Sequence, residues 1–149
     1  METDELKNKI SSGLVISNEQ MKNNPIFPNE IKSEISDTPF YLLIYIPRED
    51  VIKINCFPLR TDSIKKILIK LTEFSPDLVK GISNVLKELN LSNDIIHTTG
   101  LCYEMEKCFY ETYISGDAFK TEGLTDKIKQ NFSAIAKVID VFVEDIPKS

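Results

Sequence analysis

The stretch IKKILIKLTEFSPDLVKGISNVLKELN, residues 64–90, decides the fold because it holds one clear strand followed by one clear helix. Branched apolar residues alternate with lysines in its first part: Ile67, Ile69 and Leu71 against Lys66 and Lys70. A period of two with charge on one face is typical of a half-buried antiparallel strand. The pattern therefore predicts a strand over 64–72 with its lysines on the solvent face.

The second part of the stretch carries a helix start. Ser75 suits the N-cap, Pro76 suits the first helical position, and the helix dipole favours Asp77 in the first turn. Apolar residues then recur at helical spacing and predict a helix over 76–90. Asn90 is suited to a left-handed C-terminal cap.

Outward from this stretch, alternation and turn residues predict five more strands and one more helix. The strands are expected over 40–46, 51–57, 94–102, 108–114 and 138–143, and the helix begins near Thr125 as N-cap. From Ile64 onward the order is strand–helix–strand–strand–helix–strand. This order predicts an α+β fold with a ferredoxin-like βαββαβ core, an antiparallel sheet with two helices on one face, preceded by an extra N-terminal β-hairpin.

The chain divides by composition into three parts. Residues 1–38 are predicted to be a flexible polar tail, in which a short helix over 3–10 could form and the apolar run 14–16 could dock on the core. Residues 39–146 are predicted to be a single α+β domain. Residues 147–149 are expected to be a short C-terminal tail.

Charge and composition exclude several classes of function. The 18 Lys+Arg and 23 Asp+Glu residues give 18 − 23 = −5, which argues against binding a nucleic-acid backbone. No apolar run is long enough for a membrane span, and the first ten residues are too polar for a signal peptide. Five separated glycines exclude the clustered phosphate-binding loops. We therefore expect no nucleic acid, no membrane and no cofactor; the abundant Ile, Lys and Asn give an archaeal-like composition.

Charge is also distributed unevenly within the domain. Residues 51–90 carry seven basic and four acidic side chains, whereas residues 91–119 carry one basic and five acidic ones. Opposed patches of this kind favour self-association or a protein partner over nucleic acid.

Three cysteines without a signal peptide favour free thiols in the cytoplasm. A metal site at His97, Cys102 and Cys108, with Cys56 as a fourth ligand, is an alternative that lacks the Cys-x2-Cys spacing of zinc knuckles. A cysteine nucleophile with His97 as base is another, but no protease or hydrolase signature surrounds either cysteine. We therefore expect no enzyme, no catalytic residue and no metal.

Residues 67–114 resemble an ACT domain, a small-molecule regulatory module found beside enzymes of amino-acid metabolism. Pro76 takes the position of the turn proline, and Asn93 lies at the start of the second strand. Asp77 stands where the family usually has glycine, and Phe74 stands where it has an acidic residue. The resemblance implies an amino acid or similar ligand near this turn, bound at a homodimer interface.

The residues themselves point to the same region. The step Thr98-Thr99-Gly100 supplies hydroxyls and an approachable backbone, which could line a pocket with the helix start; a turn with satisfied caps is the alternative. The candidate ligand-binding residues are therefore Ser75, Pro76, Asp77, Asn93, Thr98, Thr99 and Gly100.

Two further clusters have a plain interpretation beside a functional one. Acidic residues around the second hairpin could do acid–base chemistry, but we expect them to be solvated: Glu104, Glu106, Glu111 and Asp117. Phe57, Phe109 and Tyr113 could form an exposed aromatic patch for a partner, or pack in the core.

Two functional hypotheses follow. The first is a non-catalytic regulatory module that binds an amino acid at a homodimer interface. The second is a protein-interaction domain, profilin-like or longin-like, that uses its sheet face and N-terminal tail. Helices within residues 1–38 packed on the sheet would favour the second hypothesis.

Overall fold

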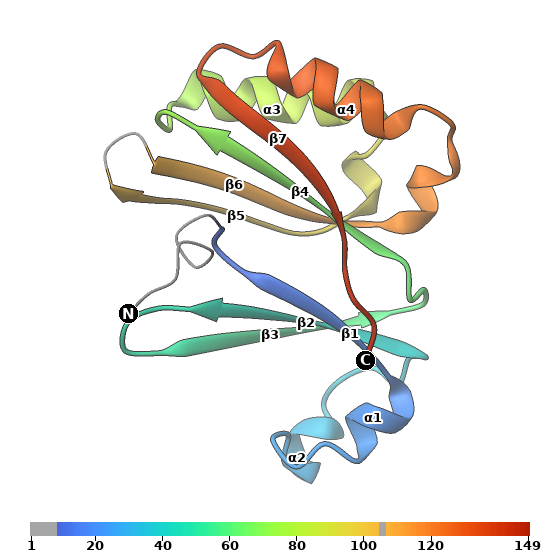
Figure 1. The fold of residues 1–149 in the computed structure, drawn as a ribbon. Helices are drawn as coiled ribbons and strands as arrows, with labels where there is room; N and C mark the ends of the chain where they lie inside the picture. The colour runs from blue at the N-terminus through green and yellow to red at the C-terminus, as the bar shows by residue number, and fades with distance from the viewer. Residues whose placement is uncertain (1–8, 105–106) are drawn as a thin grey trace.

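The computed structural model describes residues 9–104 and 107–149. In this part of the chain, seven strands form two antiparallel sheets, and helices lie at both ends of the molecule (Figure 1). The chain is therefore an α+β protein, as predicted. None of the described helices combines the length and apolar character needed to cross a membrane.

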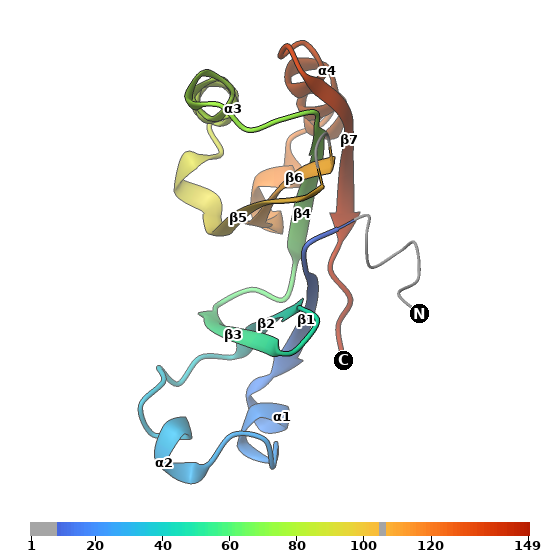
Figure 2. The same cartoon turned by 90° about the vertical axis from the view of Figure 1, so that its left-hand side faces the viewer.

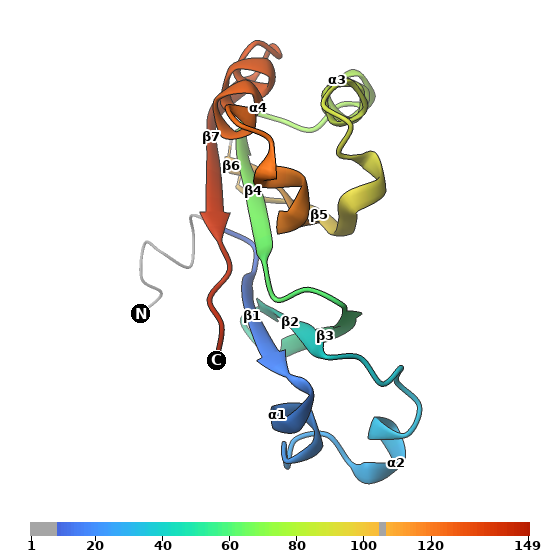
Figure 3. The same ribbon diagram turned by 90° about the vertical axis from the view of Figure 1, so that its right-hand side faces the viewer.

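The four-stranded sheet has the order β5-β6-β4-β7, with every neighbouring pair antiparallel. Its strands are β4 (Ile64–Leu71), β5 (Ile95–Glu104), β6 (Lys107–Ser115) and β7 (Val138–Asp145). Helices α3 (Pro76–Glu88) and α4 (Leu124–Ser133) pack on one face of this sheet. Figures 2 and 3 show the two helices side by side on that face.

The ends of the helices follow local chemistry, with one correction. Ser75 caps α3 by accepting a hydrogen bond from the Leu78 N–H at 3.2 Å, and Asn90 is left-handed with φ 58°, both as predicted. The prediction of Thr125 as the N-cap of the second helix is wrong. Gly123 takes that position with φ 77°, a left-handed conformation that glycine adopts without steric cost, so α4 begins at Leu124.

The three-stranded sheet has the order β1-β2-β3. It consists of β1 (Ser12–Ser17), β2 (Phe40–Pro47) and β3 (Ile52–Leu59). The predicted hairpin at 40–57 is thus confirmed as β2 and β3, but it belongs to a second sheet instead of extending the first.

The prediction of a flexible tail over 1–38 is wrong for its described part. β1 pairs with β2 along its whole length, and α1 (Asn18–Lys22) and α2 (Asn29–Lys32) follow it. Val15 docks on the core, which confirms the expectation for the run 14–16, and Met21 is also buried. These few apolar side chains are enough to order the segment, because each one packs against side chains of β2. Residues 1–8, which include most of the possible helix at 3–10, lie outside the described residues.

The C-terminal residues also form part of the three-stranded sheet, which corrects the prediction of a separate short tail over 147–149. The Val15 N–H donates to the Pro147 carbonyl, and the Ser149 N–H donates to the Val15 carbonyl, each at 2.9 Å. The tail therefore runs parallel to β1 on the side away from β2. Backbone hydrogen bonds of this kind order a segment that has little apolar surface of its own.

The two sheets bury a common cluster of apolar side chains. It contains Ile10, Val15, Leu42, Ile44, Ile46, Leu59, Ile64, Leu68, Phe109, Tyr113 and Ile146.

Two predictions are corrected by the burial of these faces. Lys66 is only 1% exposed and lies beneath the N-terminal segment instead of facing solvent, and the aromatic patch does not exist because Phe109 and Tyr113 are buried.

Candidate functional site

The predicted ligand residues at the start of α3 lie beside a surface groove of about 680 Å³. The groove is lined by Phe74, Ser75, Pro76, Val79, Lys80, Ser83, Asn84 and Lys87. Two of the predicted residues, Ser75 and Pro76, are thus on its wall. Phe74 and Val79 give this lining apolar surface, and Lys80 and Lys87 give it two positive charges.

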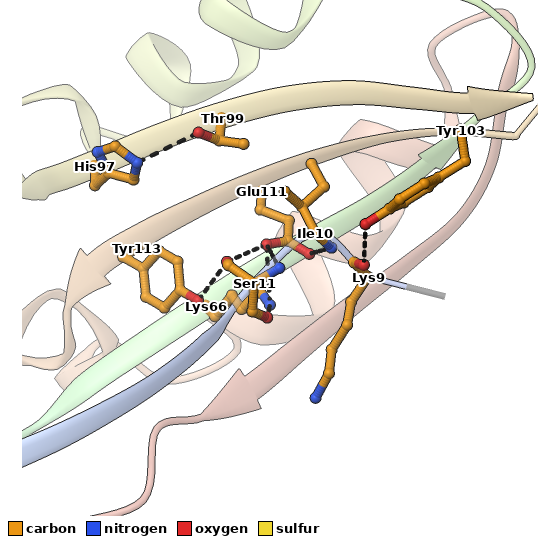
Figure 4. Close-up of polar contacts among 9 residues, drawn as sticks. All are labelled: Lys9, Ile10, Ser11, Lys66, His97, Thr99, Tyr103, Glu111 and Tyr113. Carbon is orange, nitrogen blue, oxygen red and sulfur yellow. Dashed lines mark hydrogen bonds and ion pairs between the residues drawn. The ribbon is translucent and has the colours of Figure 1, made fainter. Parts of the chain in front are cut away.

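The other predicted residues are not all brought to this groove. Phe74 covers Gly100 so closely that a Cβ at that position would lie 2.7 Å from the ring. Thr98 is engaged with Thr112, with the two hydroxyl oxygens 3.0 Å apart. Thr99 alternates to the opposite face of β5, where its hydroxyl lies 3.3 Å from His97 Nε2 (Figure 4). Asp77 stands in the first turn of α3 and Asn93 in the 3₁₀ turn Ser92–Asp94.

The prediction of three free thiols is wrong, because Cys102 and Cys108 form a disulfide. The two residues lie directly opposite each other on β5 and β6, which brings their Cα atoms to 4.0 Å. Their sulfur atoms are thus unavailable for the metal site or the nucleophile that were considered with His97. Among the described residues, no group of three His, Cys, Asp or Glu side chains could hold a metal ion.

Cys56 is the free cysteine of the described residues and lies half-buried on β3. Burial raises the pKa of its thiol to about 11. The thiol is therefore protonated at neutral pH, which makes it a poor nucleophile.

His97 lies between the two sheets. Its ring stacks at a tilt on Phe57 of β3, with the ring centroids 5.3 Å apart. Burial lowers the pKa of His97 below its ordinary value of 6.5, which favours the neutral ring.

Acidification is therefore expected to destabilise the protein through His97. As the pH falls below 6.5, the unfolded chain takes up the proton more readily than the folded one. The stabilising contribution of neutral His97 is complete above the pKa that His97 has in the unfolded chain. It is lost as the pH falls through the lower pKa that His97 has in the folded chain. Urea unfolding at about pH 7.5 and about pH 5 checks this. His97→Gln should lose less stability between the two pH values than the wild type; an equal loss would contradict the assignment.

A buried polar network lies on the face of the four-stranded sheet that meets the N-terminal segment. Its centre is the carboxylate of Glu111 on β6, which is fully buried. This corrects the expectation that Glu111 belongs to a solvated acidic stretch; Glu106 of that stretch lies outside the described residues. The carboxylate accepts hydrogen bonds from the Ile10 N–H at 2.7 Å and the Ser11 N–H at 3.1 Å (Figure 4).

Lys66 on β4 completes the network. Its Nζ lies 3.1 Å from Glu111 Oε1 and donates to the Ser11 carbonyl at 2.6 Å. Burial lowers the pKa of Lys66, and the Glu111 carboxylate opposes this shift. The Ser11 hydroxyl also contacts Glu111 and lies 2.7 Å from the Tyr113 hydroxyl.

The network ties the N-terminal segment to the four-stranded sheet. Every buried side-chain nitrogen and oxygen in the described part of the chain has a hydrogen-bond partner. Ser11 is itself buried, so its hydroxyl is not accessible although a lysine and a tyrosine stand beside it. These contacts fix residues 10 and 11 across the four-stranded sheet, just before β1.

Exposed apolar side chains lie on two outer strands, Ile139 and Phe142 on β7 and Ile52 and Ile54 on β3. Ile52 is 65% exposed and Ile54 is 39% exposed. β3 is an outer strand in the order β1-β2-β3, and no other described strand pairs with its far side. We call the outer edge of β3, together with Ile52 and Ile54, the β3 edge.

Neighbouring residues show why the β3 edge is exposed. Ile54 lies opposite Tyr45, and Cys56 lies opposite Leu43, so these side chains share one face of the three-stranded sheet. Helix α1 covers part of that face, because Met21 packs with Tyr41 and Leu43. Helix α1 does not extend over Ile52 and Ile54, which stay exposed. Sequence alternation could place these two residues on one face, but it gave no signal for which face α1 and α2 would cover.

No model of a known protein family matches this chain, and a search of curated proteins finds no relative.

Proposed function

We propose that the protein is an interaction module that receives an extended segment of another protein along the β3 edge. The observation that carries the proposal is the pair Ile52 and Ile54, exposed on a strand whose outer side has no partner among the described residues. Exposed edges of this kind pair readily with a further strand. Main-chain hydrogen bonds then supply affinity, and alternate side chains supply specificity.

The N-terminal elements support this proposal over a purely regulatory one. Helices within residues 1–38 were the feature expected to favour an interaction domain, and α1 packs on the three-stranded sheet through Met21. That sheet is an addition to the four-stranded unit that follows it. For the latter unit we propose a ferredoxin-like arrangement, supported by the order β5-β6-β4-β7 and the connections through α3 and α4.

A test of the interaction proposal uses a phage-displayed library of random peptides selected on the immobilised full chain. We expect selected peptides to alternate apolar residues and to lose binding to Ile54→Asp, which places a charge at the centre of the edge. Val79→Asp, an exposed apolar position on α3, is the matched control and should bind normally. Peptides that bind Ile54→Asp as well as the wild type would contradict the proposal.

The groove beside α3 favours a second candidate function. In this alternative the protein is an ACT-like, non-catalytic regulatory module that binds an amino acid or a similar anionic ligand at a homodimer interface. Lys80 and Lys87 would hold the carboxylate, and Phe74 and Val79 would contact an apolar side chain. A thermal-shift screen with free amino acids tests it: a ligand should raise the melting temperature of the wild type but not of Lys80→Glu.

A cytoplasmic location stays a prediction. The disulfide between Cys102 and Cys108 removes the argument for it that rested on three free thiols.

A further inference from the structure

We propose that the segment received by the β3 edge is β3 of a second copy of this chain, paired antiparallel about a two-fold axis centred on Asn55. The inference rests on the proposed function of the β3 edge and names its partner. Two three-stranded sheets would join through this contact into one six-stranded sheet.

Charge at the two ends of β3 supports a second copy as the partner. Asp50 precedes the strand and Arg60 follows it, and both are exposed. Neither side chain has an ion pair within the described residues. An antiparallel copy brings the acidic start of one strand against the basic end of the other, so one contact makes two such pairs.

The same charges select the register. Asn55 lies midway between Asp50 and Arg60 in the sequence, so an axis through Asn55 places Asp50 opposite the partner's Arg60. Facing residues of this kind interact directly across an antiparallel pair.

Neighbouring registers lose this charge pairing. An axis at Lys53 would face this lysine with the partner's Lys53, and like charges directly opposite each other are destabilising. An axis at Ile54 would place Asp50 opposite the partner's Pro58 instead of Arg60. The axis at Asn55 is therefore the one that pairs Asp50 with Arg60.

Apolar contacts agree with this register. Ile54 comes opposite the partner's half-buried Cys56, and Ile52 comes opposite the partner's Pro58, on the same face of the joined sheet. Both isoleucines would lose water contact, which stabilises the dimer. Proline at an outer strand position is compatible with the end of the paired segment.

Light scattering on the purified full chain tests the charge pairing. The wild type should have twice the 17.0 kDa mass of one chain. Asp50→Arg should halve that mass, because it faces the partner's Arg60 with a like charge, and the double variant Asp50→Arg/Arg60→Asp should restore it. All of these positions are exposed, and circular dichroism confirms that each variant is folded. A dimer unaffected by Asp50→Arg, or a double variant that stays monomeric, would overturn the proposal.

Cysteine cross-linking tests the register in a Cys56→Ser background. Asn55→Cys places a thiol opposite its own copy, within the Cα separation that a disulfide spans, and should give a covalent dimer on mild oxidation. Lys53→Cys is the matched control. In this register the two introduced thiols of a dimer lie at different points along the paired strands, too far apart for a disulfide, so this variant should stay monomeric. Cross-linking at Lys53→Cys, or at neither position, would overturn the register.

These outcomes separate the inference from the proposed function. A wild type that is monomeric yet selects peptides sensitive to Ile54→Asp would overturn self-pairing and leave the interaction module standing. A dimer that survives Ile54→Asp unchanged would overturn self-pairing through β3 irrespective of the peptide result.

Discussion

Glu111→Ala is expected to lower the free energy of unfolding by about 3–5 kcal/mol, the cost of leaving a buried charge without its partner. Lys66, which is only 1% exposed, would stay buried without its carboxylate partner. The N–H groups of Ile10 and Ser11 would also lose their acceptor. Each unsatisfied buried donor costs about 1–3 kcal/mol, although such costs overlap when they share one group.

Urea unfolding of the full chain measures this effect, with the slope m unchanged if the native state keeps its compactness. The matched control is the double variant Lys66→Met/Glu111→Gln, which removes both charges at similar volume and keeps an oxygen that can accept from the Ile10 and Ser11 N–H groups. It should recover much of the lost stability, because no unpaired charge stays buried. A single variant as stable as the wild type would contradict the role of the network.

Leu42→Ala is expected to lower the free energy of unfolding by about 2–5 kcal/mol through lost burial and the cavity left behind. Leu42 is fully buried on the central strand β2 and packs in the cluster shared by the two sheets. The loss should appear as one cooperative transition, because the cluster joins both sheets.

Ile139→Ala is the matched control for Leu42→Ala, since it removes a strand side chain that is 60% exposed and lies outside the β3 edge. Its effect should stay within about 0.5 kcal/mol. Two separate unfolding transitions for Leu42→Ala, one for each sheet, would contradict a common core. Far-ultraviolet circular dichroism followed during the urea titration distinguishes the two cases.

Local periodicity predicted the strands and helices that carry their own signal. The alternation around Ile67 and the helix start at Ser75 depend on neighbours in sequence, so both were found. β1 was missed because its short apolar run is stable only when paired with β2, which follows more than twenty residues later. Pairing across such a separation leaves no local pattern.

The buried network and the disulfide were missed for a related reason. Lys66 and Glu111 alternate with apolar residues as surface charges do, and only the N-terminal segment lying over them makes them buried. Cys102 and Cys108 become neighbours only because the β5–β6 register places them opposite each other. The candidate site has a partial signal in the sequence: alternation within the predicted strand 51–57 is compatible with Ile52 and Ile54 on one face. Their exposure depends on how far α1 extends over that face.

Amide hydrogen exchange on the full chain, at protein concentrations below and above the association midpoint, tests the central claim most directly. We expect the amides of β3 to exchange more slowly at the higher concentration, because the partner's strand covers its outer edge. The amides of β5, also an outer strand, serve as the internal control and should not change. Unchanged exchange in β3, or protection of β5 instead, would contradict the β3 edge as the contact surface.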